Sequence, residues 1–196
     1  MKIFSKVESK YINYVILNSQ TLYSQENNMK TTKIILAIIG VALLTALDQW
    51  SKMLATRYLM GQADVNVFNG ILSLTYHTNA GAAFGILQGG RWFFLVFAVV
   101  ILIAISVYYV KLPHSRVYDV IRLALVLVAA GGVGNSIDRL VNDGHVVDFL
   151  RFDFINFPIF NIADIFVTVG AGLVIVCTIV AAVREGKSKS KSESDV

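Results

Sequence analysis

Four long apolar stretches separated by polar segments dominate the chain. They run over about Ile34–Leu54, Trp92–Val110, Leu123–Ile137 and Ile162–Val183. An α-helix needs roughly 20 residues to cross a bilayer, and the third stretch reaches that length only if Val117–Ile121 belongs to it. The pattern predicts an all-α polytopic membrane protein with four transmembrane helices.

The cations predict which way these helices face. Lysines and arginines precede the first stretch, separate the second from the third, and follow the fourth. They are Lys30, Lys33, Lys111, Arg116, Arg122, Arg184, Lys187, Lys189 and Lys191. Because cytoplasmic ends of membrane helices carry the excess of lysine and arginine, this side and both termini are expected in the cytoplasm.

The two ends of the chain differ from the apolar middle. Residues 1–29 are polar and mixed and hold no apolar core of signal-peptide quality, so we expect a dispensable N-terminal extension. Met29, followed by two lysines and an apolar run, has the form of a natural start. Residues 30–184 form the predicted four-helix membrane domain. Residues 185–196, rich in Ser and Lys, are expected to be a disordered cytoplasmic tail.

Two connections are left for the outer side. In the first, residues 57–91, the segment Ile71–Tyr76 mixes β-branched, aromatic and polar residues, which predicts a small extracytoplasmic β-rich segment between helices 1 and 2. The second runs from Arg139 to Phe160 and contains Asp148, which follows two valines that favour extended backbone.

Composition narrows the class further. Hydrophobic residues make up 56% of the chain and charged residues 15%, against about 25% in soluble domains. The net charge of +4 lies at helix ends and in the tail, which argues against a nucleic-acid interface. Cys177 is the single cysteine, so an intrachain disulfide and a metal cluster built from thiolates are excluded.

Four aspartates interrupt or border the apolar stretches: Asp48, Asp138, Asp148 and Asp164. A carboxylate at membrane depth is costly and usually faces a protein interior or a wet cavity, where it has a function. Asp148 and Asp164 both fall at the outer boundary, and two such acids can act as a general acid and base. The structural alternatives are a solvated loop aspartate at 148 and a helix cap formed by Asn161 and Asp164.

The other two acids have candidate partners close by in the sequence. Asp138 shares a helix face with Asn135 and Arg139, so we expect a structural acid held by Arg139 rather than a proton carrier. Asp48 and Lys52 are spaced i, i+4, which suits an intrahelical ion pair. Their place near the outer end of the first helix also makes them candidate walls of the site.

Five motifs occur in order along the chain. They are Asp48-x-x-x-Lys52, Asn79-x-Gly81-Ala82-Ala83-Phe84-Gly85, Gly134-Asn135-x-x-Asp138-Arg139, Val146-Val147-Asp148-Phe149 and Phe160-Asn161-x-Ala163-Asp164. Together with the four spans, they resemble the lipoprotein signal peptidases (prolipoprotein or type II signal peptidases) over about Lys30 to Val183. Residues 1–28 have no counterpart in the resemblance.

The resemblance implies a membrane aspartic endopeptidase of the bacterial cytoplasmic membrane. The family cleaves diacylglyceryl-modified prolipoproteins before the lipidated cysteine, with two aspartates and no metal or other cofactor; by motif, these are Asp148 and Asp164. It also implies contact with membrane lipid, a site for globomycin-type inhibitors and a monomeric protein. Residues matching family positions that bind substrate or support the site are Asp48, Lys52, Asn79, Gly81, Asn135, Asp138, Arg139, Asn161 and Ala163.

Two other classes of function are alternatives. A serine enzyme would use Ser136, or Ser51 with Lys52, but neither serine has the glycine pattern of a nucleophile elbow. A small proton-coupled transporter would place acids at the bilayer midplane and show internal repeats. This chain has no repeat, and its acids gather at one boundary.

Overall fold

The computed structural model describes residues 2–81, 89–113 and 115–194. The chain divides into two compact units, Met1–Ala37 and Ile38–Val196. Helix α1 (Lys2–Leu59) begins in the first unit and ends in the second. The second unit also contains the other described helices and strands, and with them every residue of the predicted site that the structure describes.

Three further helices follow α1: α2 (Arg91–Lys111), α3 (Arg116–Val141) and α4 (Ile162–Ser194). Each of the four contains a segment long and apolar enough to cross a membrane, which confirms the predicted polytopic all-α class. The third span includes Val117–Ile121, the segment that its length required. Many of the large apolar side chains on these helices are exposed, as expected for surfaces that face lipid.

The end of α4 differs from the expected disordered tail. The described backbone stays helical as far as Ser194, whereas the sequence predicted disorder from residue 185. Helix propagation is favourable once a helix has formed, and the segment contains good helix formers and no proline.

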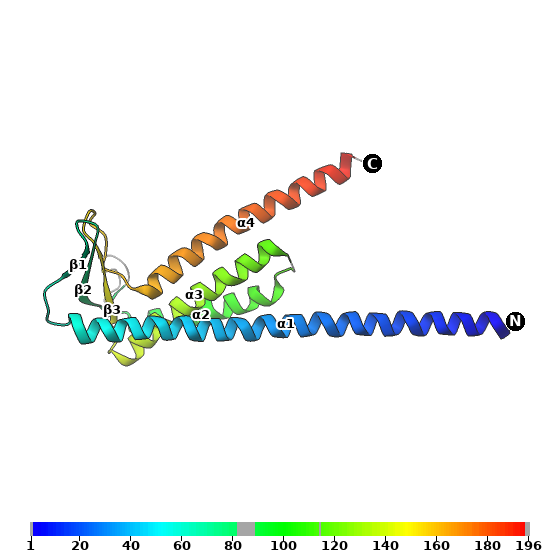
Figure 1. The fold of residues 1–196 in the computed structure, drawn as a ribbon, viewed down its shortest axis with the longest axis horizontal. Helices are drawn as coiled ribbons and strands as arrows, with labels where there is room; N and C mark the ends of the chain where they lie inside the picture. The colour runs from blue at the N-terminus through cyan, green and yellow to red at the C-terminus, as the bar shows by residue number, and fades with distance from the viewer. Residues whose placement is uncertain (1, 82–88, 114, 195–196) are drawn as a thin grey trace. The chain divides into compact units, whose positions relative to one another are not determined.

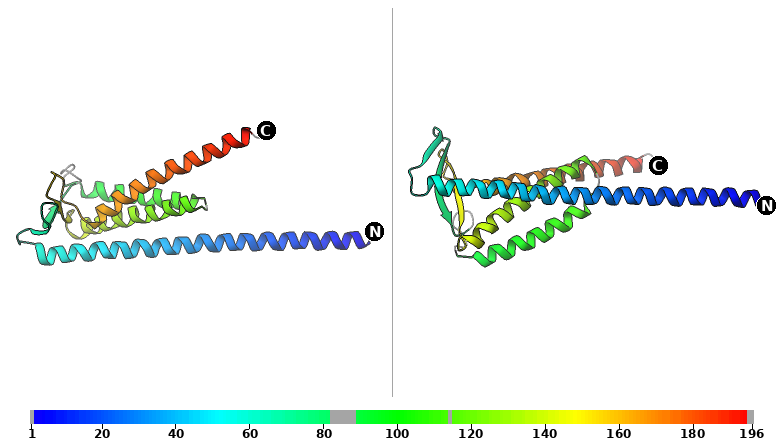
Figure 2. Two further views of the ribbon diagram at one scale, coloured as in Figure 1. Left: turned by 45° about the horizontal axis from the view of Figure 1, so that its top comes forward. Right: turned by 60° about the horizontal axis from the view of Figure 1, so that its bottom comes forward.

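A small antiparallel sheet lies at one end of the second unit. Strands β1 (Val65–Phe68) and β2 (Leu72–Asn79) form the predicted β-rich segment between α1 and α2, and β3 (Val146–Phe152) joins β2 from the connection between α3 and α4. Figure 1 shows the sheet close to the C-terminal end of α1 and to the start of α4. The start of α4 stays beside the sheet in both views of Figure 2, as the bridge between Leu150 and Phe160 requires.

Helix α3 packs closely against α4 and carries most of the buried helical residues. Gly131 permits this approach, because a Cβ there would lie 2.3 Å from the carbonyl oxygen of Ala163. A small core beneath the sheet joins Ala55 and Leu59 of α1 to Val147 and Phe149 of β3. These contacts hold the start of α4, the end of α1 and strand β3 around one region.

Candidate active site

The N-terminus of α4 is capped by its own side chains. The Oδ1 atom of Asn161 accepts a hydrogen bond from the backbone N–H of Asp164 at 3.0 Å, and Oδ2 of Asp164 accepts one from the backbone N–H of Asn161 at 3.1 Å. This reciprocal pair is a capping box, with the acid at the third helical position. The capping interpretation is therefore confirmed, and Asp164 is held at the positive end of the helix.

Strand β3 brings Asp148 to the same place. Asp148 is 2% exposed, so it is not the solvated loop residue of the alternative interpretation. Its Oδ1 accepts a hydrogen bond from Nδ2 of Asn161 at 2.6 Å, and its Oδ2 accepts one from Nδ2 of Asn79 at 3.3 Å. Asn161 thus contacts both acids, through its cap to Asp164 and its amide to Asp148.

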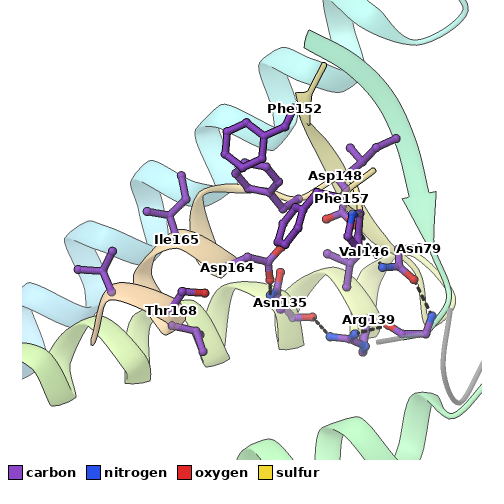
Figure 3. A pocket seen from close by; sticks show the side chains of 16 residues that line it. Asn79, Asn135, Arg139, Val146, Asp148, Phe152, Phe157, Asp164, Ile165 and Thr168 are labelled. Carbon is purple, nitrogen blue, oxygen red and sulfur yellow. Dashed lines mark hydrogen bonds between the residues drawn. The ribbon is translucent and has the colours of Figure 1, made fainter. Parts of the chain in front are cut away.

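A cavity of about 430 Å³ opens between these elements. Asp148 and Asp164 both line it, and Figure 3 shows them projecting from β3 and α4 into one space. Its polar lining also includes Asn79, Asn135 and Arg139. The rest of the wall is mostly apolar and is formed by Val146, Phe152, Phe157, Pro158, Ile159, Phe160, Ile165, Val167 and Val169, with Gly81 and Thr168.

Burial changes the acidity of Asp148. Removal from water, together with the negative charge of Asp164, raises the pKa of the Asp148 carboxyl from 3.8 to about 7, although hydrogen bonds from Asn79 and Asn161 oppose the rise. A carboxyl group with this pKa exists in both forms near neutral pH. It can therefore donate or accept a proton there, as general acid–base chemistry requires.

A buried ionic group lies behind the cavity. Nζ of Lys52 is 2.9 Å from Oδ2 of Asp48 and 2.9 Å from Oδ2 of Asp138. The intrahelical pair of Asp48 and Lys52 is thus confirmed. The expected partner of Asp138 was wrong, because the cation that pairs with it is Lys52 on a different helix rather than the adjacent Arg139. Neighbours in a helical sequence point in different directions, and only the packing of α1 on α3 could reveal Lys52.

Arg139 instead faces the cavity. Its guanidinium donates to the carbonyl oxygens of Asn135 at 3.2 Å and Gly81 at 3.0 Å, and it lies 4.5 Å from the centre of the Phe94 ring. Its buried Nε has no hydrogen-bond partner among the described residues. Gly81 also donates its N–H to Oδ1 of Asn79. The remainder of that motif, residues 82–85, lies outside the described residues.

Some site residues were not singled out from the sequence. Gln49 donates through Nε2 to Asp48, to the Gly134 carbonyl and to Asp138, so it joins α1 to α3 beside the ionic group. Phe152 and Phe157 line the cavity, and their rings contact each other at a tilt, with centroids 5.8 Å apart. The signal for Gln49 was its position next to Asp48, whereas that for the aromatics was weak, because exposed aromatics are common at membrane boundaries.

The serines considered as nucleophiles are engaged elsewhere. The hydroxyl of Ser136 donates to the Gly132 carbonyl at 2.7 Å, and that of Ser51 donates to the Asp48 carbonyl at 2.6 Å. Both are local bonds of a helical hydroxyl to its own backbone. Neither serine belongs to the described lining of the cavity.

Comparison with known proteins points to one family. A family model described as signal peptidase (SPase) II matches residues 40–180. A lipoprotein signal peptidase of Streptococcus pyogenes serotype M5 (strain Manfredo) is 42% identical over 144 residues, which cover 72% of this chain and 91% of that protein. The lipoprotein signal peptidase of serotype M18 (strain MGAS8232) matches to the same extent.

Solved structures agree with this likeness. A solved structure of a bacterial membrane enzyme is 35% identical, with a TM-score of 0.66, over 75% of this chain and 89% of the other. A second with the same description is 34% identical, with a TM-score of 0.64, over 73% of this chain and 92% of the other. Residues 40–180, which the family model matches, contain the second and third spans, part of the first and fourth, and every described residue that lines the cavity.

Proposed function

Because this chain belongs to the signal peptidase II family, we propose that it is an aspartic endopeptidase whose catalytic pair is Asp148 and Asp164. As a family member, it is a multi-pass membrane peptidase that removes signal peptides from prolipoproteins. The observation that carries the catalytic assignment is the pair of buried carboxylates, from separate elements, on the wall of one cavity. Two such groups cannot both ionise cheaply, so they share a proton.

The surroundings of each acid suggest how that proton is shared. Asp164 lies at the positive end of α4 and accepts hydrogen bonds from Nδ2 of Asn135 at 2.8 Å and from the backbone of Asn161, all of which stabilise a carboxylate. Asp148 is buried and its pKa is raised to about 7. We assign the shared proton of the resting enzyme to Asp148 and the negative charge to Asp164 on these contacts.

Cleavage then follows general acid–base chemistry. Ionised Asp164 removes a proton from a water molecule, and the resulting hydroxide attacks the carbonyl carbon of the scissile peptide bond. Asp148 donates its proton to the carbonyl oxygen, which gives a neutral tetrahedral intermediate. On collapse, the C–N bond breaks, and the proton held by Asp164 passes to the leaving amine as Asp148 recovers its own proton from the intermediate.

The position of the cavity suits a substrate that is part peptide and part lipid. The acids lie where α4 begins, at one end of its span, and the apolar wall continues along α4 through Ile165 and Val169. Acyl chains could stay in the bilayer while the peptide reaches the acids. Burial of each methylene contributes about 0.8 kcal/mol, so a diacylglyceryl group would hold the cysteine beside the pair.

The site is proposed to face the outer side of the bacterial membrane. The sheet and cavity lie at the end of α1, the start of α2 and the end of α3, whereas Lys111 and Arg116 lie at the opposite ends of α2 and α3. The excess of cations on that opposite side supports a cytoplasmic location for it and for both termini.

The test is cleavage of a synthetic diacylglyceryl-modified prolipoprotein peptide by the purified protein. Asp148→Asn and Asp164→Asn should each abolish turnover while leaving the protein folded in detergent, because each amide keeps the size but loses the titrating proton. Asp143→Asn, at a side chain that is 99% exposed, is the matched control and should retain full activity. Substantial turnover by Asp148→Asn or by Asp164→Asn would contradict the catalytic assignment. If an unlipidated peptide is cleaved as fast as the lipidated one, the proposed role of the lipid is wrong.

A further inference from the structure

Lys52 is the most enclosed cation in the neighbourhood of the proposed catalytic pair. Its residue is 3% exposed, and its ammonium contacts Asp48 on α1 and both Asp138 and Asn135 on α3, each at 2.9 Å. An ammonium has three N–H donors, so these partners occupy all of them. Lys52 is not among the described residues that line the cavity, and it therefore acts through its neighbours rather than on the substrate.

Each of the two acids that pair with Lys52 also holds the backbone next to a catalytic aspartate. Oδ1 of Asp48 accepts the backbone N–H of Ala163, the residue before Asp164, at 2.9 Å. Oδ2 of Asp138 accepts the backbone N–H of Val147, the residue before Asp148, at 3.1 Å. Both anchors come from buried carboxylates that the same ammonium holds in place.

The third partner of Lys52 reaches a catalytic carboxylate directly. Oδ1 of Asn135 accepts hydrogen bonds from Lys52 and, at 3.1 Å, from Nδ2 of Asn161, while Nδ2 of Asn135 donates to Oδ1 of Asp164 at 2.8 Å. If this amide turned end for end, its NH₂ group would face the ammonium and its oxygen would face the carboxylate. The charge on Lys52 therefore selects the orientation that supplies Asp164 with a donor.

We infer that Lys52 is a positioning residue that fixes both halves of the catalytic pair relative to each other. It does so through Asp48 to α4, through Asp138 to β3 and through Asn135 to Asp164. This inference rests on the proposed roles of Asp148 and Asp164. It assigns the buried cation a function in the reaction beyond the stability of an ion pair.

The charge on Lys52 also bears on the pH range of the enzyme. The charged groups around the pair are Asp48 and Lys52 of α1, Asp138 and Arg139 of α3, Asp148 of β3 and Asp164 of α4, and the exposed His77 of β2 lies opposite Asp148 in the sheet register. Without Lys52, Asp48 and Asp138 would be uncompensated negative charges. Removal of a proton from the catalytic pair would then require a higher pH.

The experiment replaces Lys52 with Met, which keeps an unbranched apolar side chain and removes the charge. Displacement of the pair should lower kcat about 100-fold. KM for the lipidated peptide should stay within about twofold, because the cavity wall is intact. The range of pH that supports cleavage should move upward. Arg122→Met is the matched control: Arg122 is 6% exposed and binds Asp119 and the Leu112 carbonyl near the other end of α3, so its loss should leave kcat and the pH profile unchanged.

A second variant tests the inference in case Lys52→Met folds poorly. Asp48→Asn combined with Lys52→Met removes one acid together with the base, and the amide oxygen can still accept the N–H of Ala163. Its kcat should remain low because Asn135 has lost its ammonium, with a smaller displacement of the pH profile. All rates are counted per folded molecule, so a purely structural role for Lys52 would leave kcat unchanged.

The outcomes separate this inference from the catalytic assignment. If Asp164→Asn is inactive but a folded Lys52 variant keeps its kcat, loses only substrate affinity, or shows an unshifted pH profile, the positioning role is overturned. If Asp164→Asn is itself active, the assignment of the catalytic pair fails, whatever Lys52 does.

Discussion

Asp148 shows how one residue obtains its chemistry from its surroundings. An aspartate on an exposed strand would be ionised at neutral pH, but here burial and the neighbouring Asp164 raise its pKa to about 7. The raised pKa also affects stability. The folded state holds a proton that the unfolded state releases, so the free energy of unfolding declines as the pH rises from about 4 to about 7. A residue that suits catalysis therefore weakens the fold at neutral pH.

This pKa leads to a prediction about rate. If Asp148 must carry its proton, kcat/KM should fall about tenfold for each unit of pH above about 7, since the acid form becomes scarce. The measurement is kcat/KM for the lipidated peptide from about pH 5 to about pH 9. Asp143→Asn, at an exposed side chain that does not line the described cavity, should give the same profile as the unaltered enzyme. A rate that continues to rise to the alkaline end would contradict the role of Asp148 as the acid.

At the scale of elements, the contact between α3 and α4 sets the geometry of the site. Gly131 meets the Ala163 carbonyl, and Gly134 meets the carboxylate of Asp48, to which a Cβ would come within 2.4 Å. Both glycines lie next to Ala163, the residue before Asp164. Gly131 therefore sets how closely α4 approaches α3, and Gly134 sets how closely Asp48 of α1 approaches α3.

Substitution of Gly131 and Gly134 tests whether this close packing is needed for stability and cleavage. Gly131→Ala and Gly134→Ala should each lower the free energy of unfolding by about 1–3 kcal/mol, because the added methyl group has no space, and should also reduce cleavage. Gly132→Ala is the matched control on the same helix, where a Cβ meets nothing within 4 Å. It should be neutral or stabilise by up to about 1 kcal/mol through helix propensity. Chemical denaturation in detergent measures all three, and equal stability among them would argue against close packing.

At the scale of the whole molecule, the described residues of the proposed site belong to one unit. The family match covers residues 40–180, and the site residues all lie within Ile38–Val196. The first unit, Met1–Ala37, contributes none of the described site residues. The extension at residues 1–29 therefore stays a candidate for removal.

Deletion of residues 1–28 should leave insertion and activity unchanged. Lys30 and Lys33 remain ahead of the first span to set its orientation, and the apolar stretch from Ile34 is intact. Cleavage of the lipidated peptide by the truncated and full-length proteins, each normalised to its amount in the membrane, provides the measurement. Loss of insertion on truncation would show that the extension is a necessary part of the enzyme.

Sidedness can be measured with single cysteines in a background where Cys177 is replaced by alanine. A membrane-impermeant thiol reagent applied from outside should label a cysteine at Asp143 or at Gln62, because both positions are exposed at the end that holds the sheet. A cysteine at Lys111, at the opposite end of α2, should react only after the membrane is permeabilised. The reverse pattern would invert the proposed topology.

The sequence alone determined the fold class, the approximate spans and the likeness to one family. These depend on local signals: the length of apolar stretches, cations at helix ends, and short motifs such as Asn161-x-x-Asp164, whose cap can be read from residues three apart. The strand-like segment around Ile71–Tyr76 was also readable from its composition. Residues 40–180 carried the family likeness through motifs that keep their order and spacing.

Only the tertiary structure decided which polar groups meet. Asp138 pairs with Lys52 and not with its neighbour Arg139, and Gln49 joins both acids of the ionic group. The pairing of β3 with β2 brings Asn79 to Asp148 across 69 residues of chain. Such contacts depend on the packing of distant segments, and in a buried site each charge takes whichever partner the packing supplies, because an unpaired one is costly.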